Sequence, residues 1–212
     1  MKTFVHEEVY RGKEVLDKIA KAKFTICGLG AIGSNLVMNM ARQGFTNFMA
    51  IDFDRIEDHN RHTQIWGAKE VGQMKAAMMQ RRMYDEMGLK IQIEPKKLEE
   101  TNIKKLVQKD TIVIDGFDNT EARGLVTTFC TENKIQCLHI GMHQDYAEVI
   151  WNENYRVPKK HGKDICEYPL ARNVILLAVA IGTETILRYV ATGVKENYAI
   201  TLKDCNISKL EY

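Results

Sequence analysis

Residues 24–61 read FTICGLGAIGSNLVMNMARQGFTNFMAIDFDRIEDHNR, and this stretch decides the fold. It opens with a short apolar run at 24–27, which predicts a strand of a parallel sheet that is covered on both faces. Glycines in the pattern G-x-G-x-x-G follow the run. They allow a tight turn, a close approach of backbone to phosphate, and close packing of a helix on the strand. These glycines are Gly28, Gly30 and Gly33.

The second half of the stretch supplies a helix, another strand and an acid. Apolar residues recur at helical spacing after the glycines, and Gly44 is placed to end that helix. Residues 48–51 predict the next strand, with Asp52 at its carboxyl end. A carboxylate there can bind a ribose hydroxyl, while the helix N-terminus offers N–H donors to phosphate. We therefore predict a nucleotide-binding unit; turn glycines with a purely structural purpose are the alternative.

The composition is typical of a globular α/β protein. The chain has 212 residues, of which 45% are hydrophobic and 27% charged. Lys and Arg together number 30, against 28 Asp and Glu. This near-balance gives no reason to propose nucleic acid or a membrane as a partner.

The cysteines and the N-terminal residues bear on location. Five cysteines occur without C-x-x-C spacing, which favours a reducing cytoplasm over a disulfide framework and predicts no zinc site. The first residues are charged and lack the apolar core of a signal peptide. The longest apolar run, 174–181, is too short to cross a bilayer. We therefore expect a cytoplasmic protein without a membrane span.

Strand and helix patterns alternate along most of the chain. Besides the two strands above, we expect strands at 90–93, 111–114, 136–140, 146–151, 198–202 and 207–210. We expect further helices at 14–21, 71–87, 103–107, 119–132 and 174–190. The strand–helix alternation predicts a parallel sheet, and it is lost after 136–140, where strand follows strand.

The expected fold class is therefore α/β. It is a Rossmann-like, mostly parallel sheet with helices on both faces, extended by antiparallel strands in the C-terminal third. Residues 153–171 are polar and charged and predict a long loop. Loops of that length in a compact domain are usually functional or mobile.

Charged residues follow the predicted strand ends, where open α/β sheets bind ligands. Asp52 and Asp54 belong to an acidic loop that should face a cation or hydroxyl donors, with a simply solvated loop as the alternative. Lys75, at a helix start, can reach a triphosphate or point to solvent. Asp115 and Asp118 form a carboxylate pair that suits Mg²⁺. The alternative for Asp118 is a cap on the following helix.

Together these residues resemble the ThiF/MoeB/HesA family of adenylating enzymes, relatives of the ubiquitin-activating enzymes. The motifs occur in the family's order: the glycine turn, D-F-D-x-I-E-x-x-N with Gln64 after it, V-G-x-x-K, and D-x-x-D-N-x-x-x-R. The resemblance covers roughly 7–202. It identifies 1–212 as a single ThiF-type adenylation domain, with a crossover-like loop at about 153–171.

The resemblance implies an adenylyltransferase that uses ATP and Mg²⁺. Its substrate would be the C-terminal carboxylate of a small ubiquitin-like or sulfur-carrier protein with a terminal glycine, or a peptide. By position, Asp52 would hold the ribose, Lys75 would contact the phosphates in a catalytic role, and Asp118 would be catalytic and position Mg²⁺. The other nucleotide-binding residues that it implies are Gly28, Gly30, Ala31, Gly33, Asp54, Asn60, Gln64 and Asn119.

The chain departs from the family pattern at Thr63 and in its cysteines. Thr63 stands where the family's N-L-x-R-Q has a catalytic arginine, so the role passes to Arg61, two residues earlier, or elsewhere. The family also uses an N-terminal arginine that reaches into the partner subunit's site, and Arg11 is the candidate here. The resemblance thus implies a homodimer. The family's paired zinc cysteines are missing.

Cys166 lies in the long loop, where relatives sometimes carry a thiolate that accepts the activated acyl group. The neighbouring Lys160, His161 and Lys163 would favour the thiolate. An incidental loop cysteine is the alternative interpretation.

Two other functions stay open from the sequence. Thr63 supports a catalytically degenerate ATP-binding or scaffold subunit that pairs with an active relative. The glycine turn alone is also compatible with an NAD-dependent oxidoreductase. That function would leave Lys75 and Asp118 without a purpose, and it would need a proton donor and a substrate domain.

Overall fold

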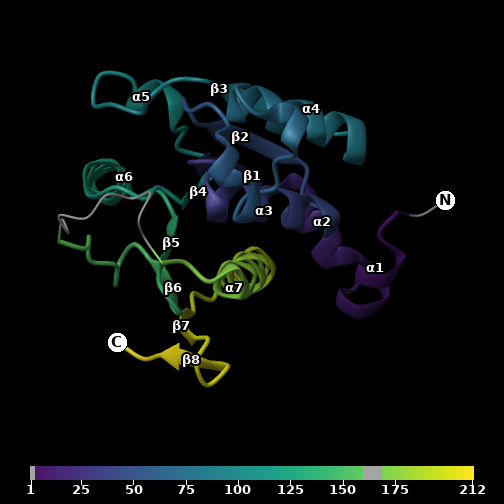
Figure 1. The fold of residues 1–212 in the computed structure, drawn as a ribbon. Coiled ribbons are helices and arrows are strands. Elements are labelled where there is room, and N and C mark those ends of the chain that lie inside the picture. The colour runs from purple at the N-terminus through teal and green to yellow at the C-terminus, as the bar shows by residue number, and fades with distance from the viewer. Residues whose placement is uncertain (1–2, 160–168) are drawn as a thin grey trace.

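A computed structural model describes residues 3–159 and 169–212 (Figure 1). Within that part, the centre is an eight-stranded sheet in the order β3-β2-β1-β4-β5-β6-β7-β8. The strands are β1 (Lys23–Cys27), β2 (Asn47–Ile51), β3 (Gln92–Glu94), β4 (Ile112–Asp115), β5 (Cys137–His143), β6 (Tyr146–Trp151), β7 (Asn197–Thr201) and β8 (Asn206–Leu210). The helices are α1 (Val5–Arg11), α2 (Lys13–Lys21), α3 (Ala31–Arg42), α4 (Lys75–Met87), α5 (Ile103–Leu106), α6 (Thr120–Asn133) and α7 (Arg172–Thr192), with 3-10 turns η1 (Asp58–His62) and η2 (Ala68–Glu70).

The first five strands are parallel, as the βαβ order predicts. Their register pairs Cys27 of β1 with Ile51 of β2 and with Asp115 of β4. Asp115 pairs in turn with His139 of β5. Because paired parallel strands end together, the turns that follow them meet at one edge of the sheet. We call this edge, formed by residues 28–30, 52–54 and 115–118, the carboxyl edge.

The last three strands are antiparallel, which confirms the expected extension in the C-terminal third. β6 returns directly alongside β5 through a tight turn in which Gln144 has a positive φ of 57°. β7 and β8 form a second hairpin at the end of the sheet. The structure therefore has the Rossmann-like α/β fold predicted from the sequence.

Helices cover both faces of the parallel strands (Figure 1). On one face, α2, α3, α4 and α7 enclose the larger apolar core. On the other face, α5 and α6 enclose a smaller core. Neighbouring residues of one strand enter opposite cores, because strand side chains alternate. Ile26 thus belongs to the α3 and α7 side, and Cys27 to the α6 side.

The 21-residue α7 packs against α3 and the antiparallel strands. Thr183 accepts a hydrogen bond from Asn39 at 3.0 Å, and a Cβ on Gly182 would lie only 2.6 Å from Ile140 Cδ1. By length and composition α7 could cross a membrane, but half of its apolar window is buried inside the fold. It is a core helix of this protein, and it includes the apolar run 174–181 noted in the sequence.

The structure corrects one helix boundary and adds one helix. Helix α4 begins at Lys75 rather than at 71, because the preceding residues bond back to the loop after β2: Gly72 N–H donates to Ile56 O at 2.8 Å. Gly72 also has a φ of +88°, which a helix cannot accommodate. The short α1 was not predicted. None of its residues is buried, so it lacks the core-facing apolar side that marks the predicted helices.

Candidate functional site

The glycine turn joins β1 to α3 at the carboxyl edge. Gly28 has a φ of +90°, and a Cβ on Gly33 would lie 1.9 Å from the Gly28 carbonyl oxygen. These two glycines therefore allow α3 to start directly against β1. A Cβ on Gly30 would meet no atom within 4 Å, so this position faces open space. Helix α3 begins at Ala31 without a side-chain cap, as a helix start that binds an anion would.

Asp52 directly follows β2 and stabilises the glycine turn through hydrogen bonds. Its Oδ2 accepts a hydrogen bond from the Leu29 N–H at 2.7 Å, and its Oδ1 accepts one from the Asp54 N–H at 2.8 Å. Burial raises the pKa of Asp52, although the Lys75 charge and these hydrogen bonds oppose the rise. Each carboxylate oxygen can still accept another hydrogen bond. Asp52 can therefore position the turn and bind a hydroxyl at the same time.

Lys75 is the first residue of α4, and its side chain is buried at the carboxyl edge. Its Nζ lies 3.0 Å from Asp54 Oδ2, and its N–H donates to the Asp54 carbonyl at 2.9 Å. The ammonium group keeps further donors beyond this ion pair. The structure thus brings the predicted residues Asp52, Asp54 and Lys75 together.

The turn after β4 packs on the glycine turn. A Cβ on Gly28 would lie 3.1 Å from Phe117 Cδ1. Asp118 follows with an exposed side chain, 3.5 Å from the Asn119 amide. Asn119 caps α6, because its Oδ1 accepts a hydrogen bond from the Ala122 N–H at 2.8 Å. The capping alternative for Asp118 is therefore wrong, and its carboxylate is exposed at the carboxyl edge.

Asp115 does not form the expected metal-binding pair with Asp118, because its side chain is fully buried. Its Oδ2 lies 2.8 Å from His139 Nδ1 and 3.7 Å from Arg123 Nη1. Its Oδ1 accepts a hydrogen bond from the Phe117 N–H at 3.0 Å. Burial alone would raise the pKa of Asp115, but the Arg123 charge and the His139 hydrogen bond outweigh it and hold the pKa below its usual value. Asp115 therefore anchors the turn that carries Asp118.

The partners of Asp115 form a buried polar cluster that the sequence did not reveal. His139 Nε2 lies 2.6 Å from Asn152 Oδ1, so both ring nitrogens face oxygen atoms. The imidazole stacks on Tyr155 with ring centres 3.8 Å apart, and the Tyr155 hydroxyl accepts a hydrogen bond from Arg123 Nη1 at 3.0 Å. These residues are distant in the chain, so their spacing carries no motif. The sequence signal was limited to Arg123, the arginine of the D-x-x-D-N-x-x-x-R motif.

Asn60 and Gln64 stabilise the η1 loop through side-chain hydrogen bonds inside it. Both side chains are buried. Asn60 Oδ1 accepts a hydrogen bond from the Glu57 N–H at 2.9 Å, and Gln64 Oε1 accepts one from the Trp66 indole at 2.6 Å. In this geometry the two predicted site residues hold the loop beside the glycine turn.

Thr63 and Arg61 differ in their surroundings. Thr63 is buried, and its carbonyl accepts a hydrogen bond from Asn35 Nδ2 of α3 at 2.9 Å. Arg61 lies on the surface in an ion pair with Asp58 at 2.6 Å. Thr63, at the position expected for an arginine, is thus packed inside the loop, and Arg61 is paired with Asp58 of η1.

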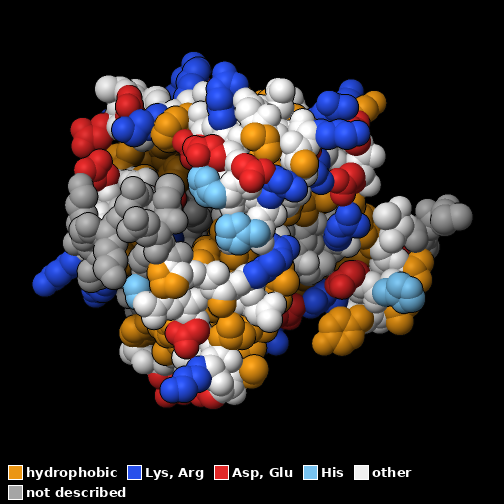
Figure 2. All heavy atoms as spheres, in the orientation of Figure 1, with side chains coloured by type: hydrophobic (Ala, Val, Ile, Leu, Met, Phe, Trp, Pro, Cys, Tyr) orange, Lys and Arg blue, Asp and Glu red, His pale blue; other side chains and the backbone are white. Residues whose placement is uncertain are grey.

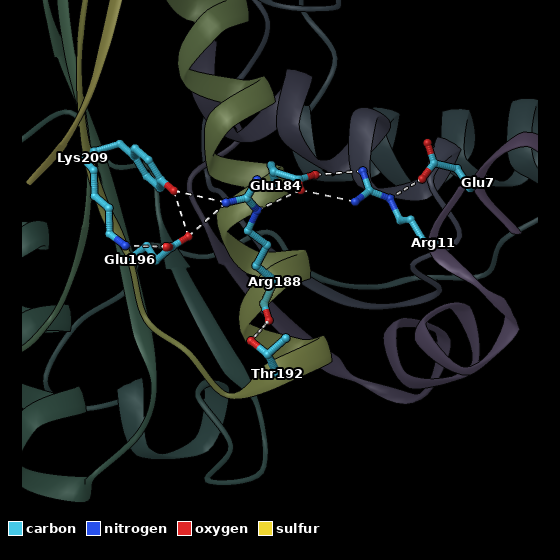
Figure 3. A network of polar contacts seen from close by, with 8 residues as sticks. Glu7, Arg11, Glu184, Arg188, Thr192, Glu196 and Lys209 are labelled. Atoms are coloured by element: carbon cyan, nitrogen blue, oxygen red, sulfur yellow. Dashed lines mark hydrogen bonds and ion pairs between the residues drawn. The ribbon is translucent and has the colours of Figure 1, made fainter. Parts of the chain in front are cut away.

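Arg11 is bound within its own chain (Figure 3). Its guanidinium contacts Glu7 at 2.5 Å and Glu184 of α7 at 2.8 Å. Glu184 also pairs with Arg188 at 3.0 Å, so α1 joins a charge network along the outside of α7. In this structure Arg11 links α1 to α7.

The described cysteines differ in accessibility, and of these Cys205 is exposed. Cys27, Cys130 and Cys137 are buried, and burial raises the pKa of the Cys27 and Cys137 thiols well above its usual value. These two are therefore not reactive thiolates. Cys166 lies outside the described residues, as do Lys160, His161 and Lys163.

A profile of the ThiF family matches residues 6–168 of this chain. The chain belongs to the ThiF family. The motifs of the carboxyl edge, from the glycine turn to Arg123, all lie inside the matched region. The family resemblance seen in the sequence is therefore confirmed.

Curated ThiF-family relatives match just over half of the chain. The sulfur carrier protein adenylyltransferase of Thermus thermophilus is 26% identical over 117 residues, which are 54% of this chain and 43% of that protein. The NEDD8-activating enzyme E1 catalytic subunit of Caenorhabditis elegans is 28% identical over 117 residues, 53% of this chain and 26% of the other. The matched segment is thus less than half the length of each relative.

Solved structures share the fold over almost the whole chain. A crystal structure of E. coli MccB with ATP has a TM-score of 0.80 and 20% sequence identity, covering 98% of this chain and 69% of that one. A structure of PaaA has a TM-score of 0.76 and 14% identity, covering 97% of this chain and 68% of the other. At these identities the likeness shows a common fold.

Proposed function

We propose that the protein is an ATP-dependent adenylyltransferase. It activates the C-terminal carboxylate of a small ubiquitin-like or sulfur-carrier protein, or of a peptide, as an acyl-adenylate and releases pyrophosphate. The observation that carries this proposal is the meeting of the glycine turn, Asp52, Lys75 and an exposed Asp118 at one edge of a ThiF-family sheet. Each of these groups has a chemical purpose in this reaction.

The residues present fit a nucleotide. The uncapped start of α3 and the open space at Gly30 suit a phosphate chain that approaches the backbone. The backbone of Gly28, Ala31 and Gly33 completes that wall. Asp52 retains acceptor capacity for the ribose hydroxyls. Asn60, Gln64 and Asn119 support the surrounding loops.

Lys75 and Asp118 supply charge of opposite sign. In the proposed complex the Lys75 ammonium contacts phosphate oxygens, with Asp54 fixing its position. Asp118 is the exposed carboxylate for Mg²⁺, which prefers one or two carboxylates together with phosphate oxygens. Bound Mg²⁺ would neutralise charge on the departing pyrophosphate.

The chemical step needs alignment more than a protein nucleophile. A carboxylate oxygen of the substrate attacks the α-phosphorus of ATP. The bond from that phosphorus to the oxygen bridging the α- and β-phosphates breaks, and pyrophosphate leaves with the bonding electrons. The protein contributes by holding carboxylate and α-phosphate in line and by stabilising the added negative charge.

The proposed substrate and partner follow from the relatives and from the proposed reaction. The similar Thermus thermophilus protein is a sulfur carrier protein adenylyltransferase, and the structurally similar MccB was solved with MccA. By analogy we propose a carrier protein or peptide substrate, a cytoplasmic location and a homodimer. Arg11 would then act across the dimer, and Cys166 would accept the acyl group.

Carboxylate-dependent exchange of pyrophosphate into ATP tests the reaction. The assay needs a panel of glycine-terminated carrier proteins and peptides. We expect Asp118→Ala to lower the exchange rate about 100-fold or more, because charge stabilisation of the leaving group is lost. Asp85→Ala, which removes an exposed acid paired with Arg81 on α4, is the control and should retain the wild-type rate. Full exchange in Asp118→Ala would refute the role of Asp118.

A scaffold subunit is the second candidate, because Thr63 is packed into the η1 loop where the family pattern has an arginine. Thermal unfolding with Mg-ATP or with NAD⁺ separates it from the others. A ligand at about 100 times its dissociation constant stabilises by about 2.7 kcal/mol. Stabilisation by Mg-ATP without exchange activity would favour the scaffold. Stabilisation by NAD⁺ alone would favour the oxidoreductase.

A further inference from the structure

Arg172 opens α7 beside the candidate site, although no sequence motif includes it. It is the first residue of the helix, and its side chain is exposed. The chain just before it is fixed: Leu170 forms a β-bridge with Gln144, and the Ala171 N–H donates to Gln144 O at 3.3 Å. The position of Arg172 is therefore set by the β5–β6 turn and by the packing of α7 on the core.

The guanidinium of Arg172 reaches the loop that borders the glycine turn. Its Nη1 donates a hydrogen bond to the His62 carbonyl at 2.9 Å. The next carbonyl, that of Thr63, accepts a bond from Asn35 Nδ2, which also bonds to Ala31 O at 2.7 Å. Ala31 is the first residue of α3. A short chain of contacts thus runs from Arg172 to the helix start that suits phosphate.

Arg172 also differs from Lys75, Arg61 and Arg123 in its charge balance. Lys75, Arg61 and Arg123 each lie within 4 Å of a carboxylate oxygen. Arg172 bonds to a neutral carbonyl, and within residues 3–159 and 169–212 no carboxylate lies within ion-pair distance of it. A guanidinium has several N–H donors in a planar fork that matches phosphate oxygens. Most of these donors are not used by the His62 contact.

We propose that Arg172 binds the β- or γ-phosphate of ATP and supplies the guanidinium that Thr63 lacks. This inference rests on the proposed function, because it takes ATP as the ligand of the carboxyl edge. Thr63 cannot take the role itself: it is buried, and its hydroxyl lies 3.4 Å from the Asn60 carbonyl oxygen. Arg172 reaches the same loop from α7, with its charge free to pair with phosphate.

Isothermal titration of the full chain with Mg-ATP and with AMP tests the inference. Arg172→Gln keeps an amide donor for the His62 carbonyl but removes the charge, and Arg172→Ala removes both. We expect both variants to bind Mg-ATP about tenfold more weakly, as expected for loss of a charged hydrogen bond. Both should bind AMP with nearly wild-type affinity, because AMP lacks the β- and γ-phosphates. Arg172→Lys should fall between the wild type and Arg172→Gln.

Arg55→Ala is the matched control. Arg55 is also exposed and also donates a bond to a backbone carbonyl, that of Gly72 at 2.8 Å. It should bind both nucleotides like the wild type. Unchanged ATP affinity in Arg172→Gln, an equal loss for AMP and ATP, or the same loss in Arg55→Ala would each overturn the inference. Failure of the unmodified chain to bind Mg-ATP would instead refute the proposed function, so the two failures are distinguishable.

Discussion

Asp115 supports the candidate site through contacts within the fold, because its side chain is fully buried. Its carboxylate is buried between Arg123 and His139, and it holds the turn that carries Asp118. Replacing it with asparagine removes the main counter-charge of the buried Arg123 guanidinium and leaves Glu148 as the remaining acid near it. Because breaking a buried ion pair is costly, we expect Asp115→Asn to destabilise the fold by about 3–5 kcal/mol at neutral pH. Denaturant unfolding measures this loss, and Asp110→Asn, at an exposed pair with Lys23, should change stability little.

The same variant makes a prediction about pH. The pKa of Asp115 is lowered in the folded protein, so the ionised group contributes stability above the unfolded pKa of about 3.9. That contribution is lost as the pH falls through the lower folded pKa. The stability difference between the wild type and Asp115→Asn should therefore be constant between about pH 6 and 8 and should shrink below about pH 4. A difference that grows on acidification would contradict the assigned direction.

At the residue scale, the sequence predicted positions that follow strand ends and missed contacts made across the fold. Asp52, Lys75 and Asp118 were found from local position: Asp52 directly follows β2, Lys75 starts α4, and Asp118 lies in the short turn between β4 and α6. The register of the strands then brings their ends together. The burial of Asp115 depends on contacts that are distant in the chain. Asp115 bonds to His139, 24 residues away, and His139 bonds to Asn152, another 13 residues further on. No local pattern encodes such a contact.

At the scale of elements, α1 is held by charge rather than by apolar packing. None of its residues is buried, Val9 is 83% exposed, and Arg11 bonds to Glu184 through two nitrogens at 3.3 and 2.8 Å. Partly exposed ion pairs contribute about 1 kcal/mol or less, so α1 should detach without unfolding the core. Figure 2 shows the same helix standing out from the body, with hydrophobic side chains on its surface.

Glu184→Gln tests this attachment. We expect faster amide hydrogen exchange within Val5–Arg11, while exchange in β1 and α3 stays at the wild-type rate, because only the link between α1 and α7 is weakened. Glu14→Gln, at an exposed pair with Lys18 in α2, is the control and should leave α1 unchanged. Slow exchange of α1 in Glu184→Gln would show that other contacts hold it.

Element boundaries were predictable where a local signal marks them. Helix α3 ends at Arg42, and Gly44 follows with a φ of +104°, as the glycine stop indicated. The start of α4 was predicted too early, because residues 71–74 bond back to the loop after β2. Gly72, a poor helix former, was the local signal against a helix at these residues.

At the scale of the whole molecule, the topology was predictable because two local rules combine. Strand–helix alternation favours parallel neighbours from β1 to β5, and its loss after β5 favours hairpins, which form between β5 and β6 and between β7 and β8. The pairing of β7 with β6 follows neither rule, because α7 lies between these two strands and they are nevertheless antiparallel. Charge, in contrast, gives little guidance to partners. Figure 2 shows acidic and basic side chains interspersed over the described part of one face, in keeping with a net charge of +2.

The proposed homodimer raises a conflict over Arg11 that a subunit-mixing experiment can resolve. In the structure Arg11 is paired with Glu184 of its own chain, so action across a dimer requires it to leave that carboxylate for a phosphate in the other subunit. A mixture of Arg11→Ala and Asp118→Ala chains would then contain hybrid dimers, each with one complete site. Since half of randomly exchanged dimers are hybrids, pyrophosphate exchange should recover to about a quarter of the wild-type rate. Each variant alone should be inactive. If subunits exchange and no activity returns, Arg11 acts within its own chain, and the contact with Glu184 is its working position.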